Sequence, residues 1–151
     1  MLTNLLDERL VCLEVAASDW EEAVRVSVRP LVDAEMVSEV YADAIVRGVR
    51  EMGPYVVVAP HVALPHARPE CGALGNALGV VTLRGPVAFG SEENDPVRYL
   101  FPLSATDNDG HLGALQELVE LLGRPEFFER LDGAKTPAEV VEVVRSMAGD
   151  A

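Results

Sequence analysis

The sequence predicts an α/β (α+β) fold in which a mixed β-sheet is flanked by helices. Short apolar segments rich in β-branched residues, such as YVVVAP at 55–60 and ALGVVTLR at 77–84, are typical of buried strands. They alternate imperfectly with segments whose apolar residues recur at helical spacing, as in 38–53. An imperfect alternation of this kind favours a mixed sheet covered by helices. With 151 residues, the chain is expected to form a single domain over 1–151.

Helices are predicted where a capping residue precedes a periodic apolar pattern. The segment 18–32 has Ser18 or Asp19 as its N-cap and acidic residues in its first turn. The helix at 38–53 ends at Gly53, which is followed by proline. The remaining predicted helices are 111–123, 125–131 and 136–148, the last with Thr136 as N-cap, Pro137 at the first position and Glu139 completing a capping box.

Strands are predicted where apolar runs are short and bounded by turn residues. The segment 62–66 continues extended after 55–60, because a residue that precedes proline avoids the α region. The other predicted strands are 8–16, 77–84, a short one near 87–89, and 97–105.

The charge balance excludes several classes of partner. Lysine and arginine total 12 against 25 aspartates and glutamates, a formal net charge of −13. A nucleic-acid surface needs clustered cations, which are lacking here, and an anionic membrane surface is disfavoured for the same reason. No apolar run reaches the roughly 18 residues of a membrane helix, so no insertion into a membrane is expected. The acidic N-terminus and the two cysteines, Cys12 and Cys71, favour a reducing cytoplasm.

His66 is the first candidate for chemistry. Pro65 precedes it and Arg68 and Pro69 follow, so the ring is presented by a stiff segment at the end of an apolar strand. An imidazole is nucleophilic near neutral pH and can carry a transferable group, and a nearby guanidinium would suit a phosphoryl group. The alternative is a histidine that only forms a hydrogen bond at a strand end. In the first case neutral His66 would react through Nε2, with its tautomer fixed by a hydrogen bond from Nδ1.

His111 and His61 are the other two histidines. His111 follows DNDG and opens the helix 111–123, where unpaired backbone N–H groups can bind an anion. It could equally be a polar residue of the first turn. His61 follows Pro60 and is best explained as a turn residue, although a third imidazole near His66 is an alternative. No H-E-x-x-H or C-x-x-C motif accompanies the three, so no metal is expected.

Several motifs together resemble a known family. The phrases DWEEAV, MGPYVVVAP, LPHARPE, FGSEENDPV and DGHL occur in this order. They are similar to the enzyme IIA component of the bacterial phosphoenolpyruvate-dependent sugar phosphotransferase system (PTS), mannitol/fructose class, and most of all to its ascorbate-type branch. The resemblance covers roughly residues 15–145, and PHARPE together with FGSEENDPV is its most specific part.

The resemblance implies a phosphotransferase without a cofactor. His66 stands at the position that is phosphorylated in this family, and His111 at that of the second active-site histidine. Arg68 is a further phosphate-binding candidate on chemical grounds, because a guanidinium fork matches two phosphate oxygens. The phosphoryl group would come from the carrier protein HPr. It would leave for a cysteine of enzyme IIB, which serves the membrane enzyme IIC in uptake of an ascorbate- or pentitol-like carbohydrate.

Three points stay open at the level of sequence. His61 departs from the family pattern, which usually has glycine there. A regulatory module, phosphorylated as a signal and not for transport, is an alternative function, and a metal-binding or hydrolytic domain that uses the three histidines is a more distant one. The transported substrate and the presence of a homodimer do not follow from the sequence.

Overall fold

The computed structural model of the chain describes residues 2–148, apart from the side chains of 108–111. The elements are 3-10 turns at Leu2–Asn4 (η1), Glu8–Leu10 (η2) and Pro69–Cys71 (η3), helices α1 Trp20–Asp33, α2 Tyr41–Met52, α3 Asn108–Leu122, α4 Pro125–Gly133 and α5 Pro137–Ala148, and strands β1 Val11–Val15, β2 Val57–Ala59, β3 Val62–Ala63, β4 Ala77–Leu78, β5 Val80–Val87, β6 Val97–Leu100 and β7 Leu103–Ser104.

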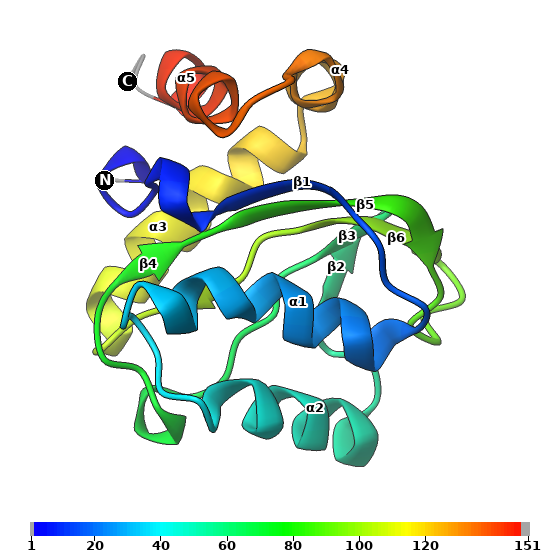
Figure 1. The fold of residues 1–151 in the computed structure, drawn as a ribbon, viewed down its shortest axis with the longest axis vertical. Coiled ribbons are helices and arrows are strands. Elements are labelled where there is room, and N and C mark those ends of the chain that lie inside the picture. Colours follow the sequence, from blue (N-terminus) through cyan, green and yellow to red (C-terminus); the bar gives the residue numbers. More distant parts are fainter. Residues whose placement is uncertain (1, 149–151) are drawn as a thin grey trace.

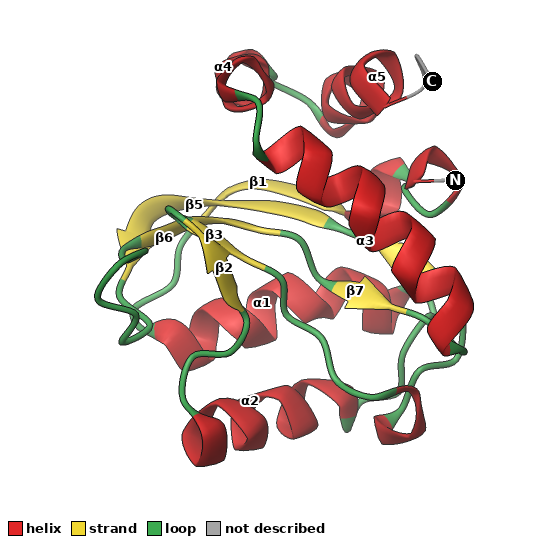
Figure 2. Cartoon of the chain, turned by 180° about the vertical axis from the view of Figure 1, so that it is seen from behind, coloured by secondary structure: helices red, strands yellow, loops and turns green. Residues whose placement is uncertain are grey.

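The central sheet is mixed, as the sequence predicts. Its strand order is β1-β5-β6-β3-β2, and a separate pair is formed by β4 and β7. The pairs β1–β5 and β3–β6 are parallel, whereas β5–β6 and β2–β3 are antiparallel. Strand β3 therefore lies inside the sheet between β6 and β2, and the chain that leaves it starts from a fixed position (Figure 2).

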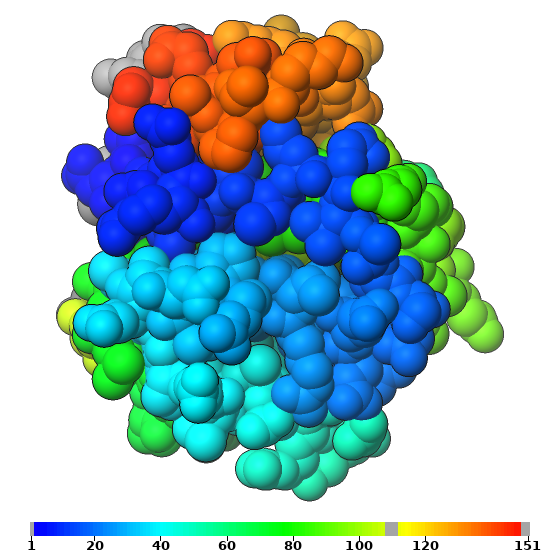
Figure 3. Space-filling model, in the orientation of Figure 1, coloured from blue at the N-terminus to red at the C-terminus, as the bar shows by residue number. Residues whose placement is uncertain are grey.

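Helices cover both faces of the sheet (Figure 1). Helices α1 and α2 lie on one face, and α3, α4 and α5 with the N-terminal turns lie on the other. In Figure 3, which keeps this view in space-filling form, the N-terminal segment and β1 form a band between the two groups. The predicted fold class is confirmed.

Strand β5 contributes to the hydrophobic cores on both faces. Val80 packs with the α3–α5 cluster, whereas Val81 and Leu83 pack with the α1–α2 cluster. Successive side chains of a strand point to opposite faces, so a strand covered on both sides is mostly apolar. This explains the apolar character of ALGVVTLR, in which Thr82 is buried and its hydroxyl accepts a hydrogen bond from the Glu14 N–H.

Two helix starts follow the predicted capping chemistry. The Asp19 carboxylate accepts a hydrogen bond from the Glu22 backbone N–H at 2.8 Å, so Asp19, and not Ser18, is the N-cap of α1. The Thr136 hydroxyl accepts from the Glu139 N–H at 3.2 Å. The Glu139 carboxylate in turn accepts from the Lys135 N–H, one residue before the cap.

Some predicted boundaries are wrong. No separate strand occurs at 87–89, because β5 continues unbroken to Val87. Helix α3 begins at Asn108, three residues before the predicted start. The apolar residues that recur at helical spacing, Leu112, Leu115, Leu118, Val119 and Leu122, predict its buried face, but Leu112 and Val119 are each 59% exposed, while Ala114, Leu118 and Leu121 are buried. Periodicity shows that apolar residues recur, but packing against the sheet decides which of them are covered.

Within residues 2–148, no helix has the length and apolar character that a membrane crossing requires.

Replacing Asp19 with alanine should lower the free energy of unfolding by about 1 kcal/mol, because the first turn of α1 loses its side-chain acceptor. Urea denaturation would measure this. Ser18→Ala is the matched control and should have little effect, since Ser18 contributes its backbone N–H, and not its hydroxyl, to the Glu22 carboxylate. Equal losses in both variants would contradict the assignment of the cap.

Candidate active site around His66

The backbone that carries His66 is held by hydrogen bonds to three neighbouring residues, which lie just before β2, just after β6 and in β7. The Leu64 N–H donates to the Val56 carbonyl at 2.7 Å, and the Pro65 carbonyl accepts from the Leu103 N–H at 3.0 Å. Just before them, the Ala63 carbonyl accepts from the Phe101 N–H. Pairing thus continues past the end of β3, and His66 projects from a fixed backbone, as its position between prolines predicts.

The His66 ring has a defined tautomer. Nδ1 lies 2.6 Å from the Leu64 carbonyl oxygen. A carbonyl oxygen only accepts hydrogen bonds, so Nδ1 carries the hydrogen, and in the neutral ring Nε2 carries the lone pair. The predicted hydrogen bond from Nδ1 to a backbone acceptor is therefore present, and Leu64 is its partner.

Two tyrosine hydroxyls hold the backbone at residues 66 and 67. The Tyr55 hydroxyl donates to the His66 carbonyl at 2.8 Å. The Tyr41 oxygen accepts from the Ala67 N–H at 3.0 Å and donates to the Leu103 carbonyl at 2.8 Å. The Ala67 carbonyl is a longer alternative acceptor for the same hydroxyl, at 3.2 Å. Tyr41 is buried, and burial raises its pKa to about 12.

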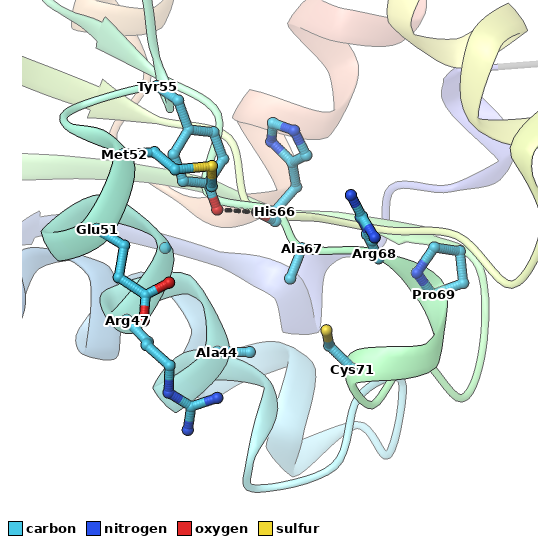
Figure 4. Close-up of a pocket in the computed structure, with 11 residues that line it drawn as sticks. Ala44, Arg47, Glu51, Met52, Tyr55, His66, Ala67, Arg68, Pro69 and Cys71 are labelled. Carbon is cyan, nitrogen blue, oxygen red and sulfur yellow. Dashed lines mark hydrogen bonds between the residues drawn. The ribbon is translucent and has the colours of Figure 1, made fainter.

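A cavity of about 540 Å³ lies beside His66 (Figure 4). Helix α2 forms one wall, and the segment that follows His66 forms the other. The lining residues are Ala44, Arg47, Gly48, Glu51 and Met52 of α2, together with Tyr55, His66, Ala67, Arg68, Pro69 and Cys71. Met52 is 69% exposed, so an apolar side chain stands at the rim of the cavity.

Two arginines line this cavity without an ion pair to any residue that the structure describes, Arg47 and Arg68. On the neighbouring surface, by contrast, Arg25 pairs with Glu21 and Asp43, and Arg50 also pairs with Glu21. Figure 4 shows the Arg68 side chain and the His66 ring on the same side of the segment that carries both. In a chain of net charge −13, these two guanidinium groups place positive charge in the cavity, together with the Glu51 carboxylate that also lines it.

His111 lies in the first turn of α3, as its fourth residue. Its side chain lies outside the described residues, as do the side chains of 108–110. The prediction that His111 faces His66 stays a prediction. What the structure adds is that the helix begins earlier than expected, at Asn108.

His61 does not belong to the cavity beside His66. It lies with Pro60 in the turn between β2 and β3, so the explanation as a turn residue is correct and the alternative, a third imidazole at His66, is wrong. The Nδ1 atom of its ring lies 2.7 Å from the Pro96 carbonyl oxygen, and its backbone N–H donates to the Asn94 carbonyl. Its φ is +67°, a left-handed conformation that favours glycine. A glycine here, as the resemblance implies for the family, would suit this conformation.

The cysteines and the metal alternative add little to the site. Cys71 lines the cavity half-buried, and Cys12 is half-buried beside the α1–α2 core, where burial raises its pKa. Among the described residues, no group of three or more His, Cys, Asp or Glu side chains could hold a metal ion.

The contribution of α2 and of the tyrosines to the site was not predicted from the sequence. Arg47 and Met52 reach the cavity from a helix that lies more than ten residues before His66, and no motif links them. Tyr55 did have a signal, since it stands within the phrase MGPYVVVAP, but that phrase suggested only a strand.

Comparisons with known proteins agree on one family. A sequence model of the family "Phosphoenolpyruvate-dependent sugar phosphotransferase system, EIIA 2" matches residues 4–147. The ascorbate-specific PTS system EIIA component of Escherichia coli (strain K12) is 38% identical over 143 residues, which cover 93% of this chain and 92% of that protein. The resemblance drawn from the motifs is confirmed.

Solved structures share the fold. The solution structure of the mannitol-specific cryptic phosphotransferase enzyme IIA CmtB from Escherichia coli has a TM-score of 0.85 and 38% identity, covering 96% of this chain and 98% of that one. The mannitol enzyme IIA of Escherichia coli, solved in complex with phosphorylated enzyme IIB, has a TM-score of 0.80 at 24% identity, covering 93% and 97%. The second likeness is one of fold.

Replacing Tyr41 with phenylalanine should lower the free energy of unfolding by about 1–3 kcal/mol, because the carbonyl of the buried Leu103 loses its hydroxyl donor and the Ala67 N–H loses its acceptor. The effect should also depend on pH. Burial raises the folded-state pKa of Tyr41 to about 12, so its contribution is complete below about pH 10, the ordinary tyrosine pKa, and is lost as the pH rises toward 12. Urea denaturation of both proteins across this range should show a steeper alkaline loss in the wild type. Parallel curves would contradict the role given to Tyr41.

At position 61, glycine should give a more stable protein than alanine, by about 1 kcal/mol, because only glycine adopts a φ of +67° without strain. Both variants lose the contact with Pro96, so the comparison isolates the backbone. Position 58, at the middle of β2, is the matched control, and there Val58→Ala should be more stable than Val58→Gly. Urea denaturation of the four variants measures both orders of stability. If alanine were more stable than glycine at position 61, as it is expected to be at position 58, the prediction would be wrong.

Proposed function

The chain belongs to the EIIA type-2 family of the phosphoenolpyruvate-dependent sugar phosphotransferase system, and on this premise we propose that His66 carries a phosphoryl group from phospho-HPr to a cysteine of an enzyme IIB. Family membership makes the chain a phosphoryl carrier. The choice of His66 is supported most directly by one observation, the contact between its Nδ1 and the Leu64 carbonyl.

The contact with Leu64 prepares Nε2 for attack. With the hydrogen held on Nδ1, the lone pair of Nε2 forms a bond to phosphorus while the bond between phosphorus and the donor's histidine nitrogen breaks, and that electron pair returns to the donor ring. The positive charge that develops on the His66 ring is stabilised at Nδ1–H by the Leu64 carbonyl. Attack by a cysteine thiolate of enzyme IIB then breaks the Nε2–P bond and restores neutral His66.

The charge of the transferred group is met by cations that line the cavity, of which Arg68 lies on the same side as the His66 ring. A phosphoryl group adds about −1.5 to −2 charges at neutral pH. Arg68 is two residues from His66 and lines the same cavity, as does Arg47, and neither is neutralised by a described carboxylate. The N-terminus of α3 and His111 are assigned the same task, because the backbone N–H groups of a first helical turn bind anions.

The partners approach through the open side of this cavity. Met52 offers a largely exposed apolar contact beside the two arginines, a combination of anchor and charge that suits a protein surface. Enzyme IIB is proposed as the acceptor in keeping with the mannitol enzyme IIA, which forms a complex with phosphorylated enzyme IIB. Through it the group would reach a membrane enzyme IIC for uptake of a carbohydrate, with ascorbate-like compounds first to be tested because of the ascorbate-specific relative.

Incubation with enzyme I, HPr and phosphoenolpyruvate should place an acid-labile phosphate on His66, located by mass mapping. His66→Ala should abolish the label. His111→Ala should slow labelling by about 10²-fold, the loss typical when one stabilising donor is removed. His61→Ala is the matched control and should label at the wild-type rate, since His61 lies outside the cavity. Undiminished labelling of the His66 variant would overturn the proposal.

Transfer to enzyme IIB separates transport from regulation. When phosphorylated wild-type protein is mixed with a cognate enzyme IIB, the label should move from His66 to a cysteine. Label that stays on His66 with every enzyme IIB tested would instead favour the regulatory module.

A further inference from the structure

We infer that Tyr55, lodged against Gly48 of α2, is a positioning residue that sets the orientation of the His66 imidazole for phosphoryl transfer. The inference rests on the proposed function of His66. Tyr55 would not touch the phosphoryl group. It would act through His66, by holding the backbone and the ring of the same residue.

Tyr55 contacts His66 at two places. Its hydroxyl donates to the His66 carbonyl at 2.8 Å. Its ring meets the imidazole edge to face, with ring centroids 5.6 Å apart and planes at 81°. Figure 4 shows the tyrosine beside His66 with this hydrogen bond drawn. Together with the bond from Nδ1 to Leu64, these contacts restrain both the backbone and the plane of the ring.

The position of Tyr55 is itself fixed. Its N–H donates to the Gly53 carbonyl at 2.7 Å, in the tight turn that follows α2. Burial raises the pKa of the phenol, so the hydroxyl keeps its hydrogen and remains a donor through the neutral range. The turn thus places the neutral Tyr55 hydroxyl next to the backbone carbonyl of His66.

Gly48 makes room for the phenol. A Cβ at this position would lie 3.1 Å from Cε1 and 3.2 Å from the hydroxyl oxygen of Tyr55, closer than ordinary contacts. Gly48 stands inside α2, where glycine is less favourable than alanine. Glycine therefore stands at a helical position that would favour alanine, and it is the position that the Tyr55 ring contacts. We take this to mean that the close approach of the ring matters more than helix stability.

Tyr41 shows how a merely structural tyrosine differs. Its hydroxyl bonds the Ala67 N–H and the Leu103 carbonyl, and it is buried. Loss of that hydroxyl deprives the carbonyl of the buried Leu103 of this donor and weakens the fold. Tyr55 is only half-buried, and the cavity beside it gives the His66 carbonyl access to water once the hydroxyl is removed. The expected effect of Tyr55→Phe is therefore on orientation, with little change in stability.

Orientation affects the rate because an in-line transfer requires the Nε2 lone pair to point at phosphorus. Tyr55→Phe should lower kcat for labelling by phospho-HPr by roughly threefold to tenfold, the effect of one neutral hydrogen bond. KM for phospho-HPr should stay unchanged, because the partner surface is intact. Tyr99→Phe is the matched control, since its hydroxyl bonds Asp132 and does not line the cavity.

Gly48→Ala tests the same contact without removing a hydrogen-bonding group. The added methyl group should displace the phenol and reproduce the loss in kcat, while thermal unfolding occurs at the wild-type temperature or above it, because alanine favours the helix. Gly133→Ala is the control, as a helical glycine whose Cβ would meet nothing within 4 Å. A structural role alone would make rate and stability fall together.

The ring nitrogens of His66 give a readout that needs no phosphate. In NMR spectra of the unphosphorylated protein, the wild type should show the tautomer with hydrogen on Nδ1, and both Tyr55→Phe and Gly48→Ala should shift the two ring nitrogens toward a mixture. If wild-type His66 is not labelled at all, the proposed function fails, while these spectra still test the contact. If the wild type is labelled and both variants keep its kcat and its nitrogen shifts, the positioning role is overturned.

Discussion

The hydrogen bond from His66 Nδ1 to the Leu64 carbonyl is the interaction on which the site depends. It spans two residues, so it forms only when the backbone between them is extended and the ring turns back along the chain. Pro65 supplies the first condition, because its ring fixes its own φ and keeps Leu64 out of the α region. Hydrogen bonds with Val56 and Leu103 hold the backbone of Leu64 and Pro65, the two residues that precede His66. They therefore fix the position of the carbonyl that the ring meets.

Electrostatics at the site reflects local arrangement and not net charge. The chain is strongly acidic, and its long-range field repels an incoming phosphate. Several arginines of the α1–α2 surface are neutralised by carboxylates, as Arg25 is by Glu21 and Asp43. Arg47 and Arg68 line the cavity without an ion pair to a described carboxylate, and the Arg68 side chain lies on the same side of its segment as the His66 ring. A guanidinium beside the site counts for more than many distant, solvent-screened carboxylates.

Helix α2 links the core to the site. Its inner face packs into the core through Ile45, Val46 and Val49, so the helix cannot move without disturbing the sheet beneath it. The side chains on the next part of its surface, with Tyr41 at its first turn, then meet the segment after β3. Because one side of α2 is held by the core, the side chains on its other side are fixed in position beside His66. An in-line transfer would require such fixed positions.

The sequence by itself determined the fold class, most of the elements and the central residue. Apolar runs gave the buried strands, capping residues gave the starts of α1 and α5, and the prolines around His66 predicted a stiff, extended segment, because these signals act over a few neighbouring residues. The family motifs added the chemistry. Tertiary structure alone decided what stands opposite His66. Arg47, Met52 and Tyr55 come to the cavity from another element, and His61, only five residues away in sequence, is carried to a turn outside that cavity by the strand between them. Contacts between elements depend on packing that no local pattern encodes, so the sequence could point to His66 but not to its surroundings.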